Sequence, residues 1–160
     1  MMRATALRFF GLLTAAVTLT IAGDRPAWAD GGERIALVIG NGAYQSLVPL
    51  PSAERNARMV ADHLRGARFR VIEGTDLDRI GLEATMRRFQ REIDPDDTAV
   101  LFYSGHSVEV DGQNYLVPVN ARLDSPNSLE VEGIGLAGLI EVLGERSADQ
   151  LVFLDAGYEL

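Results

Sequence analysis

The sequence predicts one α/β domain in which helices cover both faces of a mainly parallel β-sheet. Short apolar runs alternate with segments whose apolar residues recur at helical spacing, which is typical of β-α-β units. The run Ala99–Tyr103 is apolar throughout and predicts a strand buried on both faces. A chain of 160 residues is also long enough to bury one hydrophobic core.

The first β-α unit is predicted from Ile35 to Gly66. Ile35–Ile39 is an unbroken apolar run and is expected to form the first strand. A loop that contains Pro49 and Pro51 separates this strand from the first helix, which Gly66 ends. The apolar face of this helix consists of Ala57, Val60, Ala61 and Leu64.

The second unit leads to the central strand. A short strand is predicted over Phe69–Ile72, before a helix that begins at the capping-box pattern Thr75–Asp78. Asp94–Asp97 ends that helix and leads into the stretch Thr98–His106, in which the central strand, Ala99–Tyr103, is expected to break at Ser104-Gly105. The buried face of the helix is predicted to carry Leu82, Met86, Phe89 and Ile93.

The pattern changes after His106. Val108–Val117 predicts a β-hairpin with Asp111-Gly112 at its turn, and residues 119–130 are expected to form an irregular loop. A third amphipathic helix ends at Gly144, and the apolar run Leu151–Leu154 predicts the last strand. The third helix is identified by the spacing of Leu136, Leu139, Ile140 and Leu143.

Residues 1–29 are predicted to be a cleaved secretory signal peptide, and residues 30–160 to be the folded domain. Arg3 and Arg8 form a basic segment just before the apolar run Phe9–Ala22. After the run, Ala27-Trp28-Ala29 fits a small-x-small cleavage site. The run is too short and too rich in threonine to predict a stable membrane span. We therefore expect a periplasmic or secreted protein, with an uncleaved anchor as the alternative. A chain without cysteine forms no disulfide there.

Nucleotides and nucleic acids are not predicted as ligands. Gly40-x-Gly42 after the first strand, with Glu73 at the end of the second, has only a faint likeness to a dinucleotide-binding fold. Gln45 stands where the third glycine would be. The net charge of −8 argues against a nucleic-acid partner, which would require a basic face.

His106 is the leading candidate for a functional residue. It follows Ser104-Gly105 at the carboxyl end of the central strand, and open α/β sheets bind their ligands at those ends. An imidazole there is placed for acid–base chemistry. The alternative is a histidine that only hydrogen-bonds a loop. His63, on the first helix, is expected to be an exposed surface residue.

Five segments carry a further signal: Arg34–Tyr44, Leu50-Pro51 with the helix after it, Phe102–His106, Asp111–Val119 and Leu151–Ala156. In order and spacing they resemble the bacterial caspase-like proteins, which are relatives of metacaspases. Together they cover nearly all of residues 33–157. The resemblance implies a caspase-like three-layer α-β-α sandwich with a mostly parallel sheet and a β-hairpin after the histidine strand. It also implies an incomplete, C-terminally truncated domain.

In that family a histidine and a cysteine hydrolyse peptide bonds through a thioester. The imidazole takes or holds the thiol proton and later protonates the leaving amine. His106 matches the histidine, but Gly157 stands at the position of the cysteine, and the sequence contains no cysteine at all. The resemblance thus implies a cysteine-type endopeptidase domain that lacks its nucleophile and is inactive in proteolysis.

The same resemblance places Asp155, Ser104 and Asn56 in a pocket for a basic substrate residue. A buried carboxylate at Asp155 would need a cation or hydrogen-bond donors. Alternatively, the Asp155 carboxylate only accepts hydrogen bonds from backbone N–H groups at the end of its strand. Asn56 replaces a second acidic residue of the family, which we expect to weaken selectivity for basic residues.

No cofactor or metal is predicted. Ser107 and Asn120 stand where the family often has glycine and aspartate, so the calcium dependence possible in the family has no support here. We expect instead a peptide or protein with basic residues as ligand, and a protein partner that covers the edge strand Leu151–Leu154. The expected role is a non-catalytic binding or regulatory module. The alternatives are an active hydrolase with an unrecognised nucleophile and a truncated, non-functional fragment.

Overall fold

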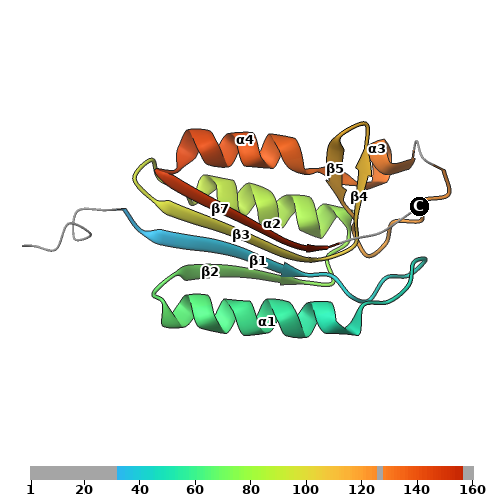
Figure 1. The fold of residues 1–160 in the computed structure, drawn as a ribbon, viewed down its shortest axis with the longest axis horizontal. Coiled ribbons are helices and arrows are strands. Elements are labelled where there is room, and N and C mark those ends of the chain that lie inside the picture. Colours follow the sequence, from blue (N-terminus) through green and yellow to red (C-terminus); the bar gives the residue numbers. More distant parts are fainter. Residues whose placement is uncertain (1–31, 126–127, 157–160) are drawn as a thin grey trace, which may run out of the picture.

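The computed structural model describes residues 32–125 and 128–156, which form three layers, with helices on both sides of a central sheet (Figure 1). The caspase-like α/β fold class predicted from the sequence is confirmed. The predicted signal peptide and Gly157 lie outside the described residues. Within the described ranges, no helix has the length and apolarity needed to cross a membrane.

The central sheet is parallel and has the strand order β2-β1-β3-β7. Its register places Gly40 beside Ser104, and Ser104 beside Asp155. The carboxyl ends of β1, β3 and β7 therefore meet at one edge of the sheet. The strands are β1 (Arg34–Gly40), β2 (Arg70–Thr75), β3 (Thr98–Gly105) and β7 (Asp149–Ala156).

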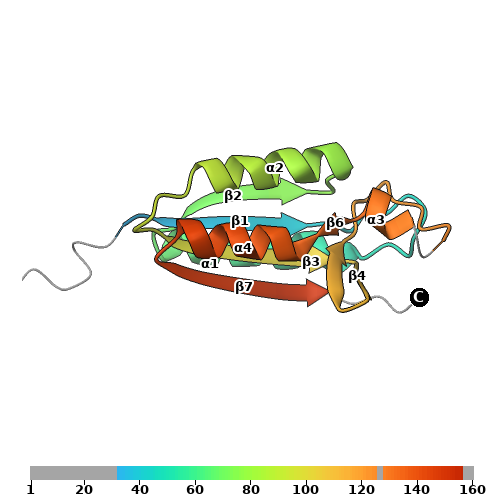
Figure 2. The ribbon, with the colours of Figure 1, turned by 90° about the horizontal axis from the view of Figure 1, so that it is seen from above.

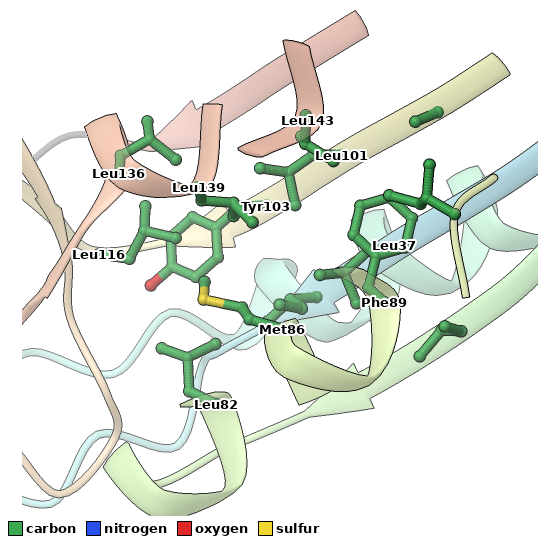
Figure 3. Close-up of a cluster of buried hydrophobic side chains, with 14 of the residues drawn as sticks. Leu37, Leu82, Met86, Phe89, Leu101, Tyr103, Leu116, Leu136, Leu139 and Leu143 are labelled. Atoms are coloured by element: carbon green, nitrogen blue, oxygen red, sulfur yellow. The ribbon is translucent and has the colours of Figure 1, made fainter. Parts of the chain in front are cut away.

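The two faces of the sheet are packed differently. On one face lies α1 (Pro51–Gly66), and on the other lie α2 (Arg79–Arg91) and α4 (Leu136–Arg146) (Figures 1 and 2). The larger core lies between the sheet and α2 and α4, where Phe89, Leu101 and Tyr103 are fully buried (Figure 3). On the other face, Ala57 and Ala61 let α1 pack close to the sheet.

A small antiparallel sheet stands beyond the end of β3. It has the order β4 (Ser107–Val110), β5 (Gln113–Leu116) and β6 (Ile134–Gly135). The predicted hairpin is confirmed, with positive φ angles of 51° at Asp111 and 75° at Gly112. Leu116 pairs with Ile134, which ties the hairpin to the segment before α4.

Several predicted boundaries were wrong. Pro51 is the first residue of α1 rather than part of the loop, a position where its missing N–H costs nothing. The N-cap of α2 is Asp78, whose carboxylate accepts the Gly81 N–H at 2.7 Å, whereas Thr75 ends β2. The predicted loop 119–130 contains the start of α3 (Ser128–Glu132). Gly144 lies inside α4, which runs to Arg146.

Candidate functional site

His106 lies directly after β3, at the carboxyl edge of the parallel sheet, and only 4% of it is exposed. Its Nε2 atom is 2.8 Å from the carbonyl oxygen of Val48, in the loop between β1 and α1. Because a carbonyl oxygen can only accept, Nε2 must carry a proton. In the neutral ring, Nδ1 is therefore the basic nitrogen.

Two tyrosines hold His106 in place. The ring of Tyr44 lies against the imidazole, with ring centroids 4.4 Å apart and planes tilted by 50°. The backbone N–H of His106 donates to the Tyr44 hydroxyl at 2.7 Å, and the Tyr103 hydroxyl donates to the His106 carbonyl at 2.9 Å. The backbone N–H and C=O groups of His106 are thus each held by a tyrosine hydroxyl.

Gly105 makes this arrangement possible. A Cβ atom at position 105 would lie 2.6 Å from the Tyr103 hydroxyl and 2.7 Å from the Tyr44 hydroxyl. Both distances are shorter than any normal contact, so a side chain would displace the two phenols. The glycine before the histidine is therefore required by packing.

Both phenols are protonated at neutral pH. Burial raises the pKa of Tyr44, although its hydrogen bonds with Tyr103 and the His106 backbone lower it in part. Burial, followed by the proximity of Tyr44, raises the pKa of Tyr103 well above 10.0. The Tyr44 hydroxyl lies 3.3 Å from the carbonyl oxygen of Val117 and can donate to it, whereas the single proton of the Tyr103 hydroxyl lies between the carbonyl oxygens of His106 and Val117, at 2.9 and 3.1 Å.

Asp155, Ser104 and Asn56 come together beside this histidine-bearing edge. The Ser104 hydroxyl and the Asn56 amide both donate to Oδ2 of Asp155, each at 2.9 Å. They line a cavity of about 280 Å³. Its wall consists of Leu50, Ser52, Ala53, Asn56, Ser104, Gly105, Asp155 and Ala156.

The expected environment of Asp155 was partly wrong. Its side chain is exposed rather than buried, because β7 is the outermost described strand of the sheet. Its carboxylate accepts from two side chains, not from backbone N–H groups. Both bonds converge on Oδ2, and among the described residues no donor is hydrogen-bonded to Oδ1, which can therefore accept from a ligand.

Two residues that support the site were not predicted. Asn41 is fully buried, and its Oδ1 accepts the Leu77 N–H at 2.9 Å while its Nδ2 donates to the Leu77 and Val117 carbonyls. Asp76 accepts the N–H groups of Gly42 and Ala43 at 2.7 and 2.8 Å. Together they fix the loop that carries Tyr44. For Asn41, the run Gly-Asn-Gly-Ala-Tyr at the end of the first strand was the sequence signal that could have pointed to this loop.

The other sequence candidates lie elsewhere. His63 is exposed on α1, and its Nδ1 atom is 2.7 Å from the Met59 carbonyl. Asn120 accepts the backbone N–H of Arg79 at 3.1 Å, where α2 begins. Ser107 is the first residue of β4. Among the described residues, no group of three or more histidine, aspartate or glutamate side chains is placed to hold a metal ion.

The arrangement offers an imidazole of fixed tautomer and a carboxylate with one open oxygen. The sequence contains no thiol. The Ser104 hydroxyl donates its hydrogen bond to Asp155, so it does not donate to the imidazole as a serine nucleophile would. This chemistry suits recognition of a cation better than attack on a carbonyl carbon.

Comparisons with known proteins agree with the fold. A family model described as the caspase domain matches residues 33–157. The human mucosa-associated lymphoid tissue lymphoma translocation protein 1 is 26% identical over 132 residues, and its mouse homolog is 26% identical over 123. These matches cover 82% and 76% of this chain but 15% and 14% of the two relatives. A crystal structure of a Geobacter sulfurreducens protein has a TM-score of 0.60 at 21% identity, covering 78% of this chain and 50% of that one.

Proposed function

Because this chain belongs to the caspase-domain family, we propose that it binds a basic side chain of a peptide or protein at the Asp155 cavity and does not hydrolyse its ligand. The observation that carries the proposal is the Asp155 carboxylate, which lines a cavity beside His106 in a chain that has no cysteine. Its open oxygen suits an ammonium or guanidinium group. The protein then acts as a binding or regulatory module.

The site's geometry supports binding over catalysis. Caspase-type chemistry requires a thiolate within reach of the imidazole, and position 157 is glycine. Ser104 is the hydroxyl nearest the cavity's carboxylate, and its proton is directed to Asp155. An unrecognised nucleophile, the competing hypothesis, must therefore come from outside this arrangement.

A combined binding and cleavage assay tests the proposal. A fluorescent peptide with one internal arginine is titrated with the purified chain, and the peptide mass is followed during prolonged incubation. We expect saturable binding and an intact peptide. Cleavage that the His106→Ala variant abolishes would instead identify a working hydrolase. Absence of both binding and a cooperative thermal transition would identify a non-functional fragment.

We also propose that the protein works outside the cytoplasm. Arg3, Arg8 and the apolar run Phe9–Ala22 support export, and Ala27-Trp28-Ala29 supports cleavage after residue 29. N-terminal sequencing of the protein recovered from a periplasmic or secreted fraction tests this. The proposal requires a mature chain that begins at Asp30, and recovery of the uncleaved chain in the cytoplasm would refute it.

A further inference from the structure

A groove between α2 and α4 gathers positive charge on a chain that is acidic as a whole. The chain has a net charge of −8, whereas this α2–α4 groove, of about 340 Å³, is lined by three arginines and one acidic residue. Both helices lie on the same face of the sheet and share one core (Figure 1). The lining residues are Arg87, Gln90, Arg91, Val142, Glu145 and Arg146.

Helical spacing explains why these side chains line one groove. Arg87 and Arg91 are four residues apart on α2, and Val142 and Arg146 are four residues apart on α4. Residues at this spacing lie on the same face of a helix. Nη1 of Arg146 lies 3.5 Å from the carbonyl oxygen of Gln90, so this side chain reaches from α4 to α2. Arginines therefore stand on both walls of the groove.

Two of the three arginines have no acidic partner within the chain's described part. Arg87 pairs with Glu83 at 3.2 Å, whereas Arg91 and Arg146 form no ion pair with residues 32–125 or 128–156. A cation near the carboxyl end of a helix is stabilised by the helix dipole, which accounts for an arginine in the last turn of each helix. The dipole does not offset the mutual repulsion of guanidinium groups that line one groove. An anion bound there would offset it.

We propose that the α2–α4 groove binds a short acidic segment of a partner protein through aspartate or glutamate side chains. Guanidinium groups present a planar fork of donors that binds a carboxylate with two hydrogen bonds. A nucleic acid or an anionic membrane would extend past the groove to the rest of the chain, whose excess of acidic residues repels it. A short segment avoids most of this repulsion, because charges farther away than about 8–10 Å are screened by salt.

The groove lies at the end of the sheet opposite His106. The last turns of α2 and α4 lead into the amino ends of β3 and β7, whereas His106 follows the carboxyl end of β3. The eight residues of β3 span about 25 Å. An acidic segment in the groove would therefore leave the Asp155 cavity open. The groove proposal does not depend on what that cavity binds.

Peptide titration tests the proposal. A fluorescent peptide with a run of glutamates, and its counterpart with glutamines, are titrated into the full chain. We expect the glutamate peptide to bind about fivefold more tightly or better, as for two exposed charge-assisted contacts. Arg91→Gln combined with Arg146→Gln should abolish this preference. The control, Arg55→Gln combined with Arg68→Gln, removes the same charge from exposed positions on α1 and just after it, and should keep the preference.

Several results would overturn the proposal. Absence of a preference for glutamate is one, and an equal loss in both double variants is another, because it would assign the effect to net charge. Duplex DNA or phosphatidylglycerol vesicles that bind more tightly than the peptide, and only when Arg91 and Arg146 are present, would assign the groove to a polyanion. Circular dichroism checks that the variants fold. If the groove double variant does not, Arg91→Gln alone decides, and an undiminished preference would overturn the proposal.

Discussion

The Nε2 atom of His106 donates to the Val48 carbonyl, and this contact determines which ring nitrogen can act as a base. His63 has the opposite arrangement, because its Nδ1 atom faces the Met59 carbonyl at 2.7 Å. The two histidines of the chain should therefore adopt different neutral tautomers, Nε2–H at His106 and Nδ1–H at His63.

Long-range ¹H–¹⁵N spectra of the neutral rings test this prediction, and His63→Gln assigns the two signals. The same tautomer at both positions would contradict the described contacts. A signal from His106 that averages both tautomers would show that the Val48 contact does not persist in solution.

Gly105→Ala should destabilise the domain by roughly 2 kcal/mol or more, because the new methyl group would overlap both phenol oxygens. The matched control is Gly138→Ala in α4, where nothing lies within 4 Å of the added carbon. That substitution should stabilise the protein by about 0.5–1 kcal/mol through helix propensity. Urea unfolding measures both changes. Equal effects would show that the tyrosine pair tolerates a side chain at position 105.

The buried tyrosines should make stability fall in alkaline solution. The pKa values of Tyr44 and Tyr103 are raised in the folded state, mainly by burial. Their contribution is complete below the unfolded tyrosine pKa of about 10 and is lost as the pH rises above it, since the unfolded chain then releases these protons first. Each tyrosine should steepen the decline by at most about 1.4 kcal/mol per pH unit, in the range between its unfolded and its folded pKa.

The sequence contains no lysine, so lysine titration does not obscure this range. Thermal unfolding between pH 9 and 11.5 should give a shallower decline for Tyr103→Phe than for the unsubstituted chain. Tyr115→Phe, on β5, is the control. A decline that Tyr103→Phe leaves unchanged would show that this phenol ionises as readily in the folded chain as in the unfolded one.

Asn56→Asp should strengthen binding of an arginine peptide a few-fold while lowering stability by roughly 1 kcal/mol. The new carboxylate would lie at hydrogen-bond distance from Asp155, where two like charges repel until a cation arrives. Asn114→Asp, an exposed substitution on β5, adds the same charge away from the cavity. Peptide titration and urea unfolding should separate the two variants. If they behave alike, the effect comes from net charge rather than from the cavity.

The sequence predicted the fold because its signals are local. The apolar run Ala99–Tyr103 marks a doubly covered strand, and Asp111-Gly112 marks a tight turn. The short strand β6 carried no such signal, since its two residues are a strand only through pairing with the hairpin.

The site was predictable in its residue types but not in its contacts. Ser104 and Asp155 follow apolar strands, so their place at the sheet's edge could be foreseen. The contact between Val48 and His106 could not, because a backbone carbonyl has no signature in the sequence. Leu151–Leu154 was expected to be an edge strand, but that expectation was not extended to Asp155, whose side chain is exposed because β7 is the outermost described strand.

The central claim is that Asp155 recognises a positive charge, and one comparison of affinities tests it most directly. Two peptides that differ only by arginine or uncharged citrulline are titrated into the unsubstituted chain, Asp155→Ala and the control Asp149→Ala at the other end of β7. We expect the unsubstituted chain to prefer the arginine peptide about three- to tenfold, as for an exposed charge-assisted contact. This preference should be lost in Asp155→Ala and kept in Asp149→Ala. An arginine preference that persists in Asp155→Ala would contradict the account.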